Sequence, residues 1–284
     1  MTQNLQGEQN FFADIAGGAI YCTYHAPAGQ PKRAVLFCSP IHEEKKSVHR
    51  PFVDAARALA QRGVAALRFD YRGTGDSPGE PMDVTPATIH EDILAAAEIV
   101  RERSGCAELD IVAMRLGATF AALALGELAP RRALLCEPIA QGKRYLARAR
   151  TRKRVRKMVT AAESGGQARP TSADDEAEGF FDFDGHPIGL EAVRQLDEID
   201  LMASDAPLCA EIVILEIAPR EKASAQALAL ADKFRERGAR VANRVIVAPP
   251  FWNALDPVSV PEFTEVVLEA LLGEGLSEAA RAGS

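Results

Sequence analysis

Arg115 stands where the apolar run Leu109–Ala113 gives way to the helix-like segment Gly117–Leu128. The start of a helix offers free backbone N–H groups and the positive end of the helix dipole, so an anion is favoured there. A guanidinium stays protonated at ordinary pH and strengthens that preference. Arg115 and the N–H of Leu116 are therefore candidate ligands for a carboxylate or a phosphate.

Two adjacent acids, Glu43 and Glu44, follow a second apolar run, Arg33–Cys38. A buried arginine without a partner is costly, so Arg115 needs either a protein carboxylate or a bound anion. In one interpretation Arg115 and Glu43 or Glu44 form an internal ion pair that fills the pocket. In the other, Arg115, Leu116, Glu43 and Glu44 line a site for an anionic or acyl small molecule. The residues leave both open.

The same loop supplies the alternative catalytic candidates, which are Cys38, Ser39, His42 and Glu44. A cysteine or serine nucleophile with His42 as its base would suit ester or acyl hydrolysis. Against this, Cys38 ends a buried run, where cysteine is commonly a small core residue. No histidine or cysteine pair has metal-ligand spacing, so neither a metal nor a cofactor is predicted.

Strands and helices must alternate to bring these residues to one edge. Short apolar runs typical of strands buried on both faces are Arg33–Cys38, Val64–Phe69, Leu109–Ala113, Ala133–Cys136, Glu211–Ile217 and Asn243–Ala248. Helical periodicity marks His49–Arg62, Ile89–Arg103, Gly117–Leu128, Ala223–Arg237 and Glu262–Leu272. This alternation predicts an α/β protein with a doubly wound, mostly parallel sheet.

Two segments depart from this alternation, one near the N-terminus and one between residues 139 and 206. The stretch Phe11–Tyr24 is predicted to form a hairpin at the sheet edge, and Thr88 with Glu91 to form the capping box of a helix. Between residues 139 and 206 regular alternation stops, which predicts an inserted cap. The core would then comprise residues 1–138 and 207–284.

Two turns carry a resemblance to the α/β-hydrolases. Asp70–Ser77, with the pattern D-x-R-G-x-G-x-S after a buried strand, resembles a turn at the carboxyl edge of their sheet. Ala113–Gly117 resembles their nucleophile elbow, G-x-S-x-G, with Arg115 in place of the serine. The resemblance implies an α/β-hydrolase fold, and the arginine implies that the serine nucleophile is missing.

The same resemblance places a triad acid and then a histidine after the last two strands. Glu221 is the carboxylate nearest the end of the first of these strands, and it is a weak catalytic candidate. After the second strand the chain contains Trp252, and no histidine follows His186. The implied protein lacks the Ser-His-acid triad and uses Trp252 to line its pocket.

Further motifs resemble the exosortase-system-associated hydrolase-like proteins. They are the acidic pair in Pro40–Glu44, the R-L-G-A elbow of Arg115–Ala118, the segment Glu137–Lys143 and the pair Phe251–Trp252. This resemblance implies a place in exopolysaccharide or envelope biology. The leading hypothesis is a protein that binds an anionic or acyl ligand, and the alternatives are a hydrolase with a non-standard nucleophile and a non-catalytic scaffold.

Charge is unevenly distributed along the chain. The net charge of −7 argues against nucleic-acid binding, yet Lys143–Lys157 contains no acidic residue and several apolar ones. Such a cationic amphipathic helix suits peripheral contact with an anionic membrane or a protein, or a cap contact with the acidic stretch Asp174–Asp184. The polar first ten residues and five scattered cysteines predict a cytoplasmic protein.

Overall fold

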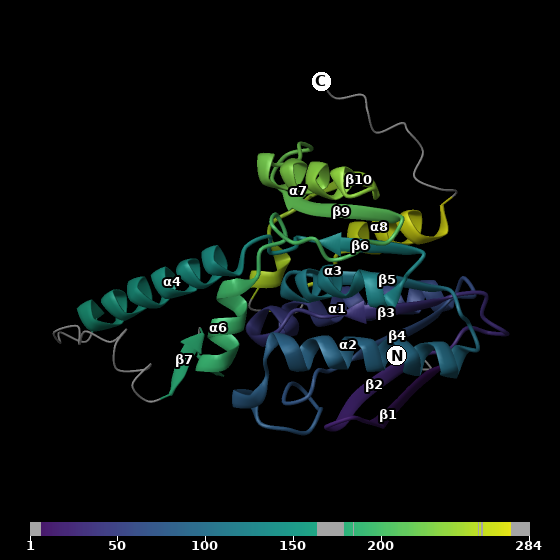
Figure 1. Ribbon diagram of the computed structural model, residues 1–284, viewed down its shortest axis with the longest axis horizontal. Helices are drawn as coiled ribbons and strands as arrows, with labels where there is room; N and C mark the ends of the chain where they lie inside the picture. The colour runs from purple at the N-terminus through teal and green to yellow at the C-terminus, as the bar shows by residue number, and fades with distance from the viewer. Residues whose placement is uncertain (1–6, 164–178, 184, 255, 257, 274–284) are drawn as a thin grey trace.

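A mostly parallel sheet of eight strands forms the centre of the protein (Figure 1). The computed structural model describes residues 7–163, 179–183, 185–254, 256 and 258–273. The strand order is β1-β2-β4-β3-β5-β6-β9-β10, and the pairs β1–β2 and β2–β4 are antiparallel. The strand bounds are β1 Glu8–Ile15, β2 Gly18–His25, β3 Ala34–Cys38, β4 Ala65–Phe69, β5 Leu109–Met114, β6 Arg132–Cys136, β9 Glu211–Ala218 and β10 Arg240–Val247. The predicted α/β class and mostly parallel sheet are confirmed.

Helices cover the sheet on both faces. In Figure 1 the strands follow one another from β1 and β2 at the bottom to β9 and β10 at the top, and the helices overlap them. One apolar cluster joins the sheet to α2, α3 and α7, and a second joins the opposite face to α1 and α8. The helical bounds are α1 His42–Ala60, η1 Pro81–Asp83, α2 Pro86–Ser104, α3 Leu116–Leu128, α7 Ala225–Glu236, η2 Phe251–Asn253 and α8 Pro261–Leu272. Every residue of β3, β5 and β6 is buried, which explains why these strands are apolar apart from Asp110 and Arg132 near their starts.

Two predicted helix starts are wrong. Helix α1 begins at His42 and not at His49, because its first turns are polar and show no apolar period, while Glu43 and Glu44 suit its N-terminus. The capping box of α2 is formed by Thr85 and Thr88, whose side chains each accept the other's backbone N–H, at 3.1 and 2.9 Å. Glu91 instead forms an ion pair with Arg72, at 2.7 Å.

The segment between β6 and β9 contributes no strand to the main sheet among the residues that the structure describes. It contains α4 Gly142–Glu163, the two-stranded sheet of β7 Phe180–Phe183 and β8 His186–Gly189, and α6 Leu190–Glu198. Helix α4 projects from the body of the protein in Figure 1. The cap boundaries at residues 139 and 206 remain a prediction.

The predicted basic helix coincides with α4. Residues 164–178, including the start of the acidic stretch Asp174–Asp184, lie outside the described residues. Asp182 of that stretch lies 3.4 Å from Lys153 on α4. Across the described part of the chain, no helix combines the length and apolarity that crossing a membrane requires.

Candidate functional site

Arg115 lies at the apex of the sharp turn between β5 and α3. Its φ of 55° and ψ of −127° fall in a region that residues other than glycine rarely adopt. Its backbone N–H donates to the carbonyl of Cys136 at 2.9 Å. A Cβ on Gly117 would lie 2.2 Å from the carbonyl oxygen of Ser39, so only glycine lets α3 approach β3 this closely.

The guanidinium of Arg115 contacts Glu44 and Trp252. Nη2 and Nε donate to Glu44 Oε1 at 2.9 and 3.2 Å. The side chains of Arg115 and Glu44 are 15% and 14% exposed. Cζ lies 4.8 Å from the centroid of the Trp252 ring in η2, within cation–π range. Glu44 Oε2 is buried and has no hydrogen-bond partner among the described residues.

Burial and neighbouring charges act in opposite directions on Arg115. Burial lowers the pKa of the guanidinium, but the Glu44 carboxylate more than offsets this, so its pKa is raised overall. Glu137, directly after β6, adds a further negative charge, although burial raises the pKa of that carboxyl. Its Oε1 accepts the N–H of Ile217 at 2.7 Å. Glu137 is not among the residues predicted for the site, although its position directly after the buried strand β6 could have indicated it.

Two other predicted ligand residues lie around this pair. Glu43 is exposed and lies 3.2 Å from His186 of β8, so it contacts the segment between β6 and β9. Leu116 is buried at the first position of α3. The structure therefore brings Arg115, Glu44, Trp252 and Leu116 together, and it directs Glu43 elsewhere.

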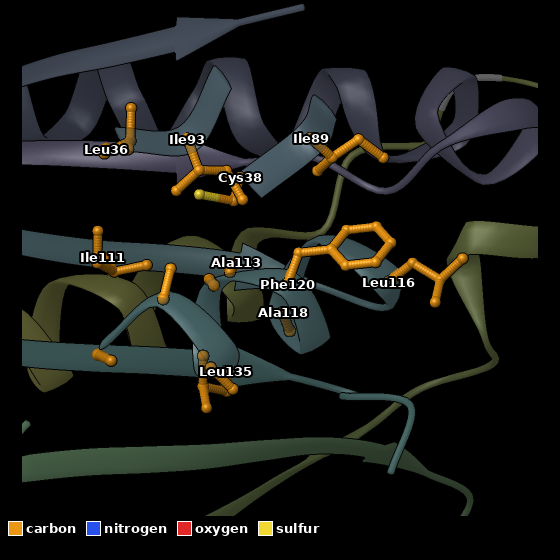
Figure 2. Close-up of a cluster of buried hydrophobic side chains, with 14 of the residues drawn as sticks. Leu36, Cys38, Ile89, Ile93, Ile111, Ala113, Leu116, Ala118, Phe120 and Leu135 are labelled. Atoms are coloured by element: carbon orange, nitrogen blue, oxygen red, sulfur yellow. The ribbon is translucent and has the colours of Figure 1, made fainter. Parts of the chain in front are cut away.

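The alternative catalytic candidates Cys38, Ser39 and His42 lie in different surroundings. Cys38 is fully buried among apolar side chains, as Figure 2 shows, and burial raises the pKa of its thiol. The backbone carbonyl of Ser39 accepts the Tyr71 hydroxyl at 2.9 Å. The His42 ring lies 5.2 Å from that of Phe183 and 5.4 Å from that of His186, measured between ring centroids.

Two carboxylates lie near the carboxyl end of β9, where the resemblance places the triad acid. Glu221 is exposed on the loop after that strand. Glu216, within β9, accepts the backbone N–H of Ser224 at 2.7 Å and so supports the start of α7.

A cavity of about 960 Å³ opens beside α1. Ser39 and His42 contribute to its lining, whereas Arg115 does not. The described residues contain no group of three or more histidine, cysteine, aspartate or glutamate side chains arranged to hold a metal ion.

A family model for serine aminopeptidase, S33, matches residues 29–173, half of the chain. The chain belongs to the serine aminopeptidase S33 family. This family membership and the fold place it in the α/β-hydrolase superfamily. No curated protein matches the chain.

Solved structures share the fold of this S33 family member at low identity. An α/β serine hydrolase without a lid from Xanthomonas campestris is 17% identical, with a TM-score of 0.59 over 94% of both chains. Est1E from Butyrivibrio proteoclasticus, solved with ferulic acid bound, is 16% identical, with a TM-score of 0.63 over 92% of this chain and 98% of its own. A thermostable carboxyl esterase from Bacillus coagulans is 14% identical, with a TM-score of 0.55 over 84% of this chain and 89% of its own. At these identities the likeness shows the fold alone.

Proposed function

We propose that the protein is an α/β-hydrolase homologue that binds an anionic acyl ligand beside Arg115 and does not hydrolyse esters through a Ser-His-acid triad. The observation that carries this proposal is the guanidinium at the apex of the elbow, bonded to Glu44 and stacked on Trp252. An arginine at this position cannot attack a carbonyl carbon, since it has no nucleophilic lone pair at ordinary pH.

The surrounding residues support a loss of triad chemistry. Trp252 lies beyond the last strand, where the α/β-hydrolase resemblance places the histidine base. The Cys38 thiol is fully buried, and its raised pKa disfavours the reactive thiolate. Hydrogen bonds from Ser39 Oγ or Cys38 Sγ to a histidine do not occur among the described residues.

The remaining donors suit a small carboxylate. Glu44 engages Nε and Nη2 of Arg115, so Nη1 keeps its N–H groups for a ligand. The N–H of Leu116, at the start of α3, adds a donor and the favourable end of the helix dipole. Trp252 supplies an aromatic surface. Est1E binds ferulic acid, a carboxylic acid with an aromatic ring, and a ligand of that class matches these groups.

Calorimetric titration with ferulate and with its neutral methyl ester tests this proposal. We expect the wild type to bind ferulate more tightly than the ester, and Arg115→Gln to weaken ferulate binding at least about tenfold, the loss of one charge-assisted hydrogen bond. Arg131→Gln is a matched control, because Arg131 also pairs with a buried carboxylate, Asp110. Equal ferulate binding by the wild type and Arg115→Gln would contradict the proposal.

Ester or acyl hydrolysis with Ser39 as nucleophile and His42 as base is the second candidate function. It is favoured by one observation, which is that both residues line the same cavity. Turnover of p-nitrophenyl esters and labelling by a fluorophosphonate, each abolished in Ser39→Ala and His42→Gln, would support it. Labelling that persists in Ser39→Ala would exclude Ser39 as the nucleophile.

A scaffold role remains a third proposal. Helix α4 exposes Arg144, Arg148 and Arg154 together with Val155 and Met158. Such a surface suits an anionic membrane or an acidic protein. A cytoplasmic protein serving exopolysaccharide or envelope biology, as the exosortase-system resemblance implies, would be consistent with this surface.

A further inference from the structure

One part of the sheet carries polar side chains on the face that α1 and α8 cover elsewhere. Residues of β1, β2 and β4 whose register brings them to this face include Asn10, Thr23, His25 and Arg68. On the same face β3 and β5 contribute the apolar residues Val35, Phe37, Val112 and Met114. The one acid of these two strands there, Asp110, pairs with Arg131. The cavity of about 960 Å³ lies here, between α1 and the β1–β2 hairpin.

Arg68 lines this cavity and lacks a carboxylate partner within the described chain. It is mostly buried, and its Nε donates to Nε2 of His25 at 3.0 Å. Its two η nitrogens make no hydrogen bond or ion pair with any described residue. Burial lowers the pKa of the Arg68 guanidinium, and the carboxylates of Glu8 and Asp70 oppose this only in part.

The nearby carboxylates are already engaged. Glu8 pairs with Arg57 at 2.5 Å, and Asp70 pairs with Lys45 at 2.8 Å. Either acid reaches Arg68 only over a longer range. Because both acids have other partners, the η nitrogens of Arg68 remain available, within the cavity, to an anion from outside the chain.

Helix α1 presents a further cationic stripe to the same cavity. Its cations are Lys46, Arg50 and Arg57, which line the cavity on one side of the helix. Arg50 pairs with Asp54 at 2.9 Å and Arg57 with Glu8, so these two charges are already partly balanced. The α1 residues in the lining of the cavity run from position 42 to position 57, about 22 Å along a helix. Its volume suits a small molecule rather than a lone ion.

We propose that this groove is a second ligand site, in which Arg68 binds the oxyanion of a small phosphorylated or carboxylated molecule through its two η nitrogens. A planar guanidinium is suited to such two-point contact with a carboxylate or phosphate. Thr23 and Asn10 lie beside Arg68 in the cavity and offer hydrogen bonds to the body of the ligand. Neither Arg115 nor Glu44 lines this cavity, so the proposal does not depend on ligand binding beside the elbow.

Titration with inorganic phosphate and, separately, with acetate tests this site in the full chain. Phosphate binding is followed by phosphorus NMR line width, and the binding of either anion by the rise in melting temperature, at neutral pH and constant ionic strength. We expect saturable binding of at least one of the two anions, which also distinguishes a phosphate from a carboxylate site. Arg68→Gln should weaken that binding at least about tenfold, and Arg68→Lys should weaken it less, because the charge remains while the two-point contact is lost.

Two variants complete the test. Arg62→Gln removes an exposed arginine two residues beyond α1 and should leave anion binding unchanged. Arg235→Gln removes an exposed arginine on α7, which does not line the cavity, and should likewise leave anion binding unchanged. The proposal is overturned if neither anion binds, or if Arg68→Gln binds as well as the wild type while remaining folded by circular dichroism.

Discussion

At the scale of single residues, the pair of Arg115 and Glu44 places two charges in a pocket from which water is largely excluded. Removing one partner leaves the other buried without compensation, and this costs about 3–5 kcal/mol in comparable pairs. We therefore expect Arg115→Met to lower the free energy of unfolding by about 3 kcal/mol. The double variant Arg115→Met with Glu44→Met should recover most of that loss, because neither charge remains. Urea unfolding of the four proteins in this cycle measures both effects, and purely additive losses would argue against a coupled pair.

The titration of His25 predicts that the stability of the protein depends on pH. Burial and the neighbouring Arg68 lower the pKa of its imidazole from 6.5 to about 4. Between these values the unfolded chain binds a proton that the folded chain does not, so stability is complete above pH 6.5 and declines as the pH falls toward 4. The shift corresponds to roughly 3 kcal/mol.

Unfolding measured from neutral pH down to pH 4 should show this decline in the wild type, and a shallower one in His25→Gln. His90→Gln is the control, because His90 is only partly buried and lies on α2. An identical slope for the wild type and His25→Gln would mean that His25 is not held in its neutral form.

The sequence indicates some of these residues and not others for a physical reason. Arg115, Glu44 and Trp252 each follow a strand end, and the carboxyl ends of parallel strands meet at one edge. Arg68 and His25 lie within strands. Whether their side chains are covered by a helix or line a cavity depends on the packing of the sheet face, which the sequence does not show. In the sequence, Arg68 can be recognised only as a single charge inside the apolar run Val64–Phe69.

At the scale of elements, the contact between α3 and β3 fixes the elbow. Gly117 faces the backbone carbonyls of Cys38 and Ser39, which cannot move without shifting β3. We expect Gly117→Ala to lower the free energy of unfolding by about 2–3 kcal/mol, in spite of the better helix propensity of alanine. Chemical denaturation measures this loss.

Gly126 offers a matched control in the same helix. A Cβ there would meet the side chain of Pro207, on a loop before β9, instead of a strand backbone. Gly126→Ala should therefore cost less than Gly117→Ala. A larger loss at Gly126 would show that the approach of α3 to β3 does not limit this helix.

Element boundaries show where local pattern is insufficient. Five of the six predicted strands are largely buried, as continuous apolar runs indicate, whereas the sixth, β10, is an edge strand in which only Ala242 and Ile246 are buried. The first turns of α1 escape prediction, because their side chains face the groove or the elbow pocket and not the apolar core. The residues of α1 that line the groove or contact Arg115, such as His42 and Glu44, are therefore the ones that interrupt its apolar periodicity.

At the scale of the whole molecule, positive charge is concentrated on α4, although the chain carries a net charge of −7. A cationic helix that projects from an acidic body can approach an anionic surface while the rest of the protein is repelled (Figure 1). We expect the full chain to sediment with vesicles that contain phosphatidylserine and not with neutral vesicles. Raising the salt from about 0.1 M to about 0.5 M should release it, since screening shortens the range of the attraction.

Charge substitutions on α4 separate this attraction from a general effect of charge. Arg144→Gln with Arg148→Gln removes two exposed cations of the helix and should weaken vesicle binding by about 2 kcal/mol at low salt. Arg62→Gln with Arg220→Gln changes the net charge equally at exposed positions elsewhere and should leave binding nearly unaltered. Binding that resists salt would exclude a mainly electrostatic contact and would instead assign it to the exposed Val155 and Met158. Equal losses in the two double variants would show that net charge, rather than α4, governs the encounter.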